Sequence, residues 1–258
     1  MRIIRYRTRG RPAYGVLDDD DTVRRLDGSP FGDHSAGRAV AKLGEVELLA
    51  PVESPGKVIG VGLNYKAHIE ESGHSAPKFP MLFMKPSTAV IGPGAPIVYP
   101  RDGERVEFEA ELAVVIGKSA KHVSKDQALD YVLGYTCGND VSARTIQFAE
   151  MKTGVLLIGK GFDTFCPLGP AIATGLDPTD LTVTARLNGK QRQRANTSDL
   201  LFSVAELVSY ISDAITLLPG DVILTGTPSG VGPIAPGDVV EIEVSGVGVL
   251  RNPVVGEE

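Results

Sequence analysis

The segment RVEFEAELAVVIG, residues 105–117, alternates three glutamates with nonpolar side chains. Because successive side chains of a β-strand point to opposite faces, a strand here places Glu107, Glu109 and Glu111 on the same face. Like charges this close repel each other. The segment therefore predicts a strand that concentrates negative charge on one side, and the rest of the fold has to accommodate that charge.

The local pattern leaves two interpretations of this strand open. Charged side chains are common on the solvated face of an edge strand, which requires no ligand. However, residues 112–116 (LAVVI) are nonpolar on both faces, which is typical of a strand that enters a core and becomes partly desolvated. A divalent cation would neutralise the acids there, and a site with only oxygen ligands suits Mg²⁺ or Mn²⁺ better than Zn²⁺.

A third candidate ligand lies in GYTCGNDVSARTIQ, residues 134–147. Asp140 stands where a strand-like run ends and where we expect a helical turn that begins at Ser142. The local pattern is equally consistent with a metal ligand and with an N-terminal cap that faces the positive end of the helix dipole.

The first fifty residues predict a small β-rich unit. Strand-like pieces cover residues 2–7 and 14–17, and Gly/Pro turns separate them. Residues 51–56 (PVESPG) are rich in turn formers and mark a boundary. We therefore expect two domains, at residues 1–55 and 56–258.

Two capping boxes predict the main helices, each ahead of a periodic apolar stretch. They pair Ser124 with Gln127 and Ser203 with Glu206, and the stretches stop at Gly134 and at Pro219. Elsewhere strand-like alternation dominates, and Pro-Gly-Asp-Val occurs twice, at 219–222 and 236–239, each time as a turn that leads into a strand. Many strands, few helices and 30 glycines predict an α+β, β-rich fold built on a rolled or sandwiched sheet.

The composition is that of a globular protein, with 42% hydrophobic and 22% charged residues among 258. A net charge of −6 argues against nucleic acid or an anionic membrane as a partner. The apolar runs are too short to span a bilayer and the N-terminus lacks an apolar signal core, so we expect a cytoplasmic protein. Cys137 and Cys166 have no spacing typical of a zinc site or a disulfide framework.

Six short motifs follow one another along the chain. They are GVGLNYKAHIEE (60–71), FEAELAVVIGK (108–118), GYTCGNDVSARTIQ (134–147), GKGFDTFCPLGP (159–170), LNGKQRQRANTSDLLFSVAELVSYIS (187–212) and PGDVILTGTPSGVG (219–232). In this order they resemble the fumarylacetoacetate hydrolase family over residues 57–255. The first fifty residues are similar to the small domain that precedes this catalytic module in some bacterial members.

The resemblance implies a mixed β-sandwich roll, usually a homodimer, with Mg²⁺ or Mn²⁺ held by Glu109, Glu111 and Asp140. The larger eukaryotic enzyme of the family has a further aspartate ligand ahead of a lid. Residues 58–67 contain no acid in this chain, so waters or substrate oxygens are expected to complete the coordination.

A possible catalytic pair is formed by His68 and Glu71, which are three residues apart. A helical turn would stack them on one face, where Glu71 can orient the imidazole and raise its basicity. A solvated histidine on a surface helix is the alternative. In similar family members the pair lies on a closing lid, and the glycines around residues 60–62 and the stretch 73–77 predict mobile flanks.

The resemblance also points to four further residues. Lys160 corresponds to a family lysine near the metal that could hold a substrate oxyanion, although an exposed turn lysine is the ordinary alternative. Arg144 and Gln147 share a helical face and by resemblance reach the substrate, where an arginine can clamp a carboxylate. Thr227 lies in a Gly-rich turn whose hydroxyl and amides could bind a substrate carboxylate, or it serves only the turn.

These residues predict an enzyme that acts on a small 2-oxo or 2,4-dioxo acid. The first hypothesis is hydrolysis of a carbon–carbon bond in an acylpyruvate or fumarylpyruvate, through an enolate that the metal stabilises. Isomerisation of 2-hydroxyhepta-2,4-diene-1,7-dioate and decarboxylation of a 2-oxo acid are alternatives within the family. A non-catalytic metabolite-binding module is the rival from another class, and the retention of His68, Glu71 and Lys160 disfavours it.

Overall fold

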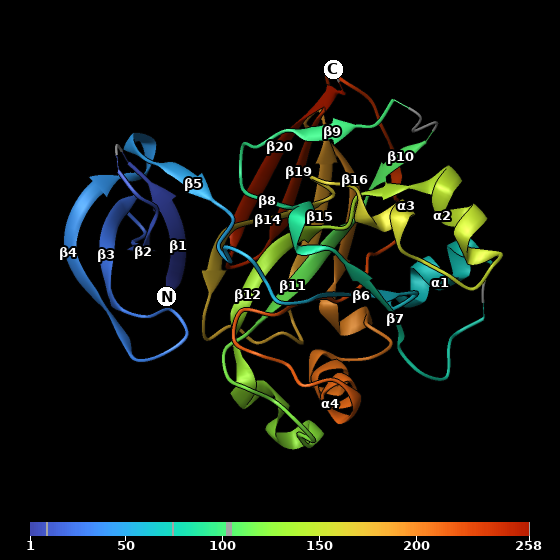
Figure 1. Ribbon diagram of the computed structural model, residues 1–258, viewed down its shortest axis with the longest axis horizontal. Helices are drawn as coiled ribbons and strands as arrows, with labels where there is room; N and C mark the ends of the chain where they lie inside the picture. The colour runs from blue at the N-terminus through green and yellow to red at the C-terminus, as the bar shows by residue number, and fades with distance from the viewer. Residues whose placement is uncertain (9, 74, 102–104, 258) are drawn as a thin grey trace.

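The computed structural model describes residues 1–258 except residues 9, 74, 102–104 and 258. Within the described residues the strands form three sheets, of twelve, three and five strands, whereas the helices are few and short (Figure 1). The α+β, β-rich fold predicted from the sequence is confirmed.

The N-terminal strands form one end of the twelve-stranded sheet (left in Figure 1). They are β1 (Arg2–Arg7), β2 (Ala13–Leu17), β3 (Thr22–Gly28), β4 (His34–Lys42) and β5 (Glu47–Leu49), with the 3₁₀ helix η1 (Leu43–Glu45) before the last. Both predicted strands of this region are present. β1 also pairs with β14 (Cys166–Ala173), Arg2 lying opposite Ala173, so the sheet continues into the rest of the molecule. The division into two domains at residue 55 stays a prediction.

The centre of the same sheet carries the strand that follows the glutamates. Beyond β14 the order is β12 (Val132–Asn139), β11 (Ala110–Ile116), β17 (Val222–Leu224), β6 (Val58–Gly62) and β7 (Met81–Lys85), with β8 (Val90–Ile91) beside β14. In β11, Leu112 and Val114 belong to one hydrophobic cluster, whereas Ala113 and Val115 belong to another on the opposite face. The strand therefore enters the core, as its apolar run predicts.

A second sheet packs against this one. It contains β16 (Lys190–Asn196), β15 (Thr182–Leu187), β19 (Val239–Val244), β20 (Gly248–Gly256) and β9 (Ile97–Tyr99). Its buried Val183 and Ile242 share one core with Leu112 and Val114, which makes the architecture a β-sandwich. The repeated Pro-Gly-Asp-Val turns do lead into strands, β17 and β19, but these strands lie in different sheets.

A small third sheet extends the β11–β12 pair past the acidic residues. Its strands are β13 (Ser142–Ala143), β10 (Val106–Phe108) and β18 (Gly232–Ile234). β10 precedes Glu109, and β13 follows Asp140. Because β10 and β13 pair with each other, the chain is held on both sides of these two acids.

The described residues contain four α-helices, α1 (Lys66–Ser72), α2 (Arg144–Met151), α3 (Ile158–Gly161) and α4 (Val204–Ala214), and the further 3₁₀ helices η2 (Ser87–Ala89), η3 (Lys125–Tyr131) and η4 (Thr197–Asp199). α1, α2 and α3 gather on the side of the sheets opposite the N-terminal strands, near β7 and β10 (Figure 1). None of these helices is long and apolar enough to cross a membrane.

The capping box at α4 is confirmed. The Glu206 N–H donates to Ser203 Oγ at 3.3 Å, and the Ser203 N–H donates to Glu206 Oε2 at 2.8 Å. The helix ends at Ala214, before the expected stop at Pro219, because Leu217 leaves it to form a β-bridge with Ala120.

Two expectations about helix starts are wrong. Residues after Ser124 form the 3₁₀ helix η3 rather than an α-helix, and the Ser124 side chain contacts Gln127 instead of capping the backbone. Likewise α2 begins at Arg144, whereas Ser142 lies in β13 and donates its hydroxyl to the Asp140 carbonyl. At Ser142, pairing of β13 with β10 outweighs the local helix signal.

Replacing Ser203 with alanine removes the acceptor for the first turn of α4. We expect a loss of about 1 kcal/mol in the free energy of unfolding, measured by urea denaturation. The control is Ser119→Ala, which changes an exposed serine outside the helices and strands. Equal stabilities for the two variants would contradict a stabilising role of the cap.

Candidate active site and metal centre

Three acidic residues meet at one end of the β11–β12 pair. The two strands are antiparallel with Ala110 opposite Asn139, so the residues that flank this pair, Glu109, Glu111 and Asp140, come together. One carboxylate oxygen of each lies within 4.8 Å of the others. The three residues are 5%, 2% and 1% exposed, respectively, which excludes the solvated edge-strand interpretation.

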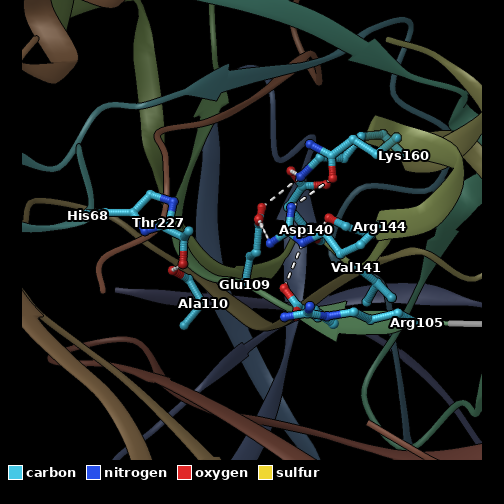
Figure 2. A network of polar contacts seen from close by, with 12 residues as sticks. His68, Arg105, Glu109, Ala110, Asp140, Val141, Arg144, Lys160 and Thr227 are labelled. Atoms are coloured by element: carbon cyan, nitrogen blue, oxygen red, sulfur yellow. Dashed lines mark hydrogen bonds and ion pairs between the residues drawn. The ribbon is translucent and has the colours of Figure 1, made fainter. Parts of the chain in front are cut away.

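Buried cations surround the cluster. The Lys160 ammonium donates to Glu109 Oε2 at 2.7 Å and to Asp140 Oδ2 at 2.5 Å, as Figure 2 shows. Lys85 at the end of β7 donates to the other oxygen of Asp140 at 2.5 Å. Arg144 donates to Glu109. Both oxygens of Glu109 and of Asp140 are therefore paired with positive charge.

Glu111 differs from its two neighbours. Among the described residues it has no ion pair, and its Oε2 accepts from the Gly226 N–H at 2.6 Å. Gly226 has φ of 100°, and a Cβ there would meet Asn64 at 2.8 Å, so only glycine brings this amide so close. Burial and the charges of Asp140 and Glu109 raise the pKa of Glu111 well above its usual range.

The pKa of Glu109 moves in the opposite direction. Burial alone would raise this pKa, but the charges of Arg144 and Lys160 outweigh it and lower the pKa. Burial would lower the pKa of Lys160, yet the charges of Asp140 and Glu109 raise it, so the ammonium stays protonated. The Lys160 ammonium therefore lies between Glu109 and Asp140, and Glu111 beside them has no ion pair among the described residues.

This arrangement fits a hard divalent ion. The three acids offer oxygen ligands only, and the Lys160 ammonium already bridges two of them in the manner of a bound cation. The positive charge of a dication would also offset the burial and the neighbouring negative charges that raise the pKa of Glu111. Glu109, Glu111 and Asp140 are thus the residues that would hold Mg²⁺ or Mn²⁺.

The acids form the floor of a cavity of about 280 Å³. His68 on α1 lines the same cavity, and its Nδ1 lies 3.4 Å from Glu71 Oε2. The His68 side chain is only 16% exposed, so it faces the cavity and not bulk solvent. The predicted pairing of His68 and Glu71 is present, although a catalytic role for it stays a prediction.

The lid expectation is tested only in part. α1 ends at Gly73, whose φ of 70° is the left-handed conformation that glycine favours. Glu71 Oε2 also accepts from the Gly230 N–H at 3.3 Å, which links α1 to the loop before β18. Residue 74 lies outside the described residues, so mobility of the stretch 73–77 stays a prediction.

Arg144, Gln147 and Thr227 all line the cavity, yet their polar groups already have protein partners. Arg144 donates to Gln147 Oε1 at 2.7 Å in addition to its bonds with glutamates. Thr227 donates to the Ala110 carbonyl at 2.9 Å and accepts from Gln193 (Figure 2 shows the first bond). These contacts hold the acidic strand in place, and direct substrate binding by the three residues stays a prediction.

Sequence reasoning missed three residues of this site. Lys85 pairs with Asp140, Gln193 joins Thr227 to β11, and Glu150 accepts from three backbone N–H groups at residues 157–159 just before Lys160. A lone lysine in the apolar strand MLFMK was a usable signal, because a buried ammonium needs a buried acid. Nothing local distinguishes Gln193 or Glu150 from surface residues.

Comparison with known proteins identifies the family. Residues 57–255 match the family described as fumarylacetoacetate (FAA) hydrolase C-terminal, and residues 1–51 match Rv2993c-like, N-terminal. The chain belongs to the fumarylacetoacetate hydrolase family. It is therefore an enzyme of the kind that the family contains, with a candidate acidic metal site in the position that its motifs predict.

Relatives and solved structures agree with this membership. Protein Rv2993c of Mycobacterium tuberculosis is 46% identical over 99% of this chain and 98% of its own length. Oxaloacetate tautomerase Fahd2a, mitochondrial, of Rattus norvegicus is 43% identical over 82% of this chain and 70% of its own. The 5-carboxymethyl-2-hydroxymuconate delta-isomerase of Mycobacterium smegmatis has a TM-score of 0.91 at 48% identity, with both chains fully covered.

One solved structure bears on the metal. The maleylpyruvate hydrolase of Sphingobium sp. SYK-6, in complex with manganese(II) ion and pyruvate, has a TM-score of 0.82 at 32% identity, again with full coverage of both chains. That enzyme carries a divalent ion on the same fold. The cluster of this chain offers oxygen ligands, which suit Mn²⁺.

Replacing Lys160 with methionine removes the ammonium that bridges Glu109 and Asp140. We expect Mn²⁺ to bind about tenfold tighter or more, because a buried like charge no longer opposes it. Isothermal titration of Mn²⁺ into metal-free protein measures this affinity, and Lys118→Met, at an exposed position, controls for the change in net charge. Weaker or unchanged Mn²⁺ binding in the Lys160 variant would contradict the interpretation that the ammonium occupies the place of a bound cation.

Proposed function

We propose that this chain is a divalent-metal-dependent hydrolase that cleaves a carbon–carbon bond in a 2,4-dioxo acid of the acylpyruvate or fumarylpyruvate type. The observation that carries the proposal is the single cavity lined by both the acidic cluster and the His68–Glu71 pair. Hydrolysis needs an electrophile and a base in reach of one substrate, and this cavity supplies candidates for both.

The acidic cluster serves the 2-oxo end of the substrate. When held by Glu109, Glu111 and Asp140, Mg²⁺ or Mn²⁺ supplies Lewis-acid stabilisation of negative charge on the 2-oxo acid. Arg144 and Lys85 donate to Glu109 and Asp140, respectively, and orient these carboxylates for that task. The buried cations thus fix the positions of the carboxylates that would bind the metal.

The His68–Glu71 pair serves the distal carbonyl. Glu71 can accept a hydrogen bond from Nδ1–H of His68, which leaves the other ring nitrogen free to take a proton from water. The hydroxide that forms attacks the C4 carbonyl, where the Lys160 ammonium can donate to the developing oxyanion. The C3–C4 bond then breaks, the carboxylic acid leaves, and the enolate of pyruvate takes up at C3 the proton that His68 removed from water.

An isomerase, tautomerase or decarboxylase is the second candidate. It is favoured by the similarity to an oxaloacetate tautomerase and to a 2-hydroxyhepta-2,4-diene-1,7-dioate isomerase. In an isomerisation or a tautomerisation, His68 would carry a proton between two substrate atoms. Neither of these reactions nor a decarboxylation consumes water. The two candidates are separated by the products formed from one panel of acids, namely acetylpyruvate, fumarylpyruvate, oxaloacetate and 2-hydroxyhepta-2,4-dienedioate.

Replacing His68 with alanine removes the proposed base without touching the acidic cluster. We expect hydrolysis of the preferred acid to fall on the order of 10²- to 10⁴-fold, while Mn²⁺ affinity and the melting temperature stay close to those of the wild type. Loss of ultraviolet absorbance of the dioxo acid, with Mg²⁺ or Mn²⁺ and with a chelator, measures the rate.

The matched control is His122→Ala, which changes a histidine with a 69% exposed side chain outside the cavity. Full hydrolysis in the His68 variant would remove the proposed base. An absence of metal-dependent turnover of every acid in the panel by the wild type would overturn the proposed function itself.

A further inference from the structure

The cavity has a charged floor and nonpolar walls. Eight of its lining residues are hydrophobic and come from β6 and the turn after it, from β7, from α2 and from the loops beside them: Val61, Leu63, Met81, Phe83, Phe148, Met151, Leu156 and Val231. Such walls suit the carbon chain of an oxo acid. They provide no partner for a second charge at the far end of a substrate.

Arg105 is a charged residue at the rim of the cavity, beside these nonpolar walls. Three cations line the cavity among the described residues, and Arg144 and Lys160 are both buried against Glu109. The Arg105 side chain is instead 60% exposed. Figure 2 shows Arg105 beyond Arg144 from Lys160. It is therefore the guanidinium that an arriving ligand can reach.

Glu107 holds Arg105 at this position. Its Oε1 accepts from Nε and Nη2 of Arg105 at 2.7 and 2.5 Å, while its Oε2 accepts from Nε of Arg144 at 2.6 Å. Because Glu107 is 2% exposed and is engaged through both oxygens, it cannot swing away with Arg105. Nη1 of Arg105 has no recorded partner within the part of the chain that the structure describes.

An arginine fixed in this way is suited to a carboxylate. A guanidinium presents its donors in a rigid fork, and orienting it in advance reduces the entropy lost on binding. Glu107 already has a buried partner in Arg144, which it shares with Glu109, and Arg105 adds an exposed guanidinium that contacts Glu107 through Nε and Nη2 only. The position of Arg105 therefore points to a ligand that carries its own negative charge at the rim.

We propose that Arg105 is a specificity-determining residue that binds the distal carboxylate of a dicarboxylic oxo acid whose 2-oxo end lies at the acidic cluster. The inference rests on the proposed function for the 2-oxo end, and it adds the charge at the other end. A monocarboxylic acylpyruvate occupies the same cavity without this contact, with its tail against the nonpolar walls.

The first experiment compares a dicarboxylic with a monocarboxylic substrate. Arg105→Met and wild type, loaded with Mn²⁺, are assayed with fumarylpyruvate and with acetylpyruvate. We expect the ratio of kcat/KM for fumarylpyruvate to that for acetylpyruvate to fall at least tenfold, mainly through KM, because a charge-assisted hydrogen bond is lost. Arg105→Lys, which keeps the charge but not the fork, should recover part of this ratio.

Arg251→Met is the matched control. Arg251 has a 62% exposed side chain and, like Arg105, an ion pair with a glutamate, but it lies on β20 outside the cavity. We expect this variant to retain the wild-type ratio. An equal loss with both substrates in Arg105→Met would make Arg105 a structural support for Glu107 and would overturn the proposal.

A binding experiment separates failure of this proposal from failure of the proposed function. Mn²⁺-loaded wild type and Arg105→Met are titrated with 2-oxoglutarate and with 2-oxopentanoate, which differ in the distal carboxylate. We expect wild type to bind 2-oxoglutarate at least tenfold more tightly, and Arg105→Met to lose that preference. If wild type hydrolyses no dioxo acid but shows this preference, the reaction is wrong and the role of Arg105 stands; without a preference, the role of Arg105 falls.

Discussion

Burial of Glu109, Glu111 and Asp140 is the constraint around which this end of the molecule is built. A carboxylate taken out of water costs several kcal/mol unless charges and hydrogen bonds replace its hydration. Lys160 and Arg144 do so for Glu109, and Lys160 and Lys85 do so for Asp140. From the residues that the structure describes, Glu111 receives an amide hydrogen bond from Gly226 and no ion pair. The cluster is therefore short of positive charge, which is the condition under which a dication binds.

The cations reach the cluster from separate parts of the fold. Lys85 ends β7, Arg144 begins α2, and Lys160 lies in α3, whose first residues are held by the Glu150 carboxylate. The same elements supply much of the cavity wall. Stability of this region and the chemistry of the site therefore depend on the same contacts, and the site forms only when the sheet and the helices are assembled.

Parts of the site were predictable from short sequence patterns. The period of a strand places Glu109 and Glu111 on one face, and the spacing of His68 and Glu71 suits a helical turn, which α1 provides. The cap of α4 at Ser203 was equally local. The same pattern at Ser124 does not cap an α-helix. The residues that follow it form the 3₁₀ helix η3 and then enter β12. Local patterns succeed where no strand competes for the backbone.

The sequence by itself determined the fold class from its many strand-like segments, and its six ordered motifs determined the family and, through that resemblance, the identity of the three acids. Only the tertiary structure decided what those acids touch. Lys85 is 55 residues from Asp140, and Glu107 is 37 residues from Arg144, so neither pair follows from a local pattern. Long-range pairs are selected by the packing of whole strands and helices, and the requirement to compensate buried charge acts only once that packing has excluded water.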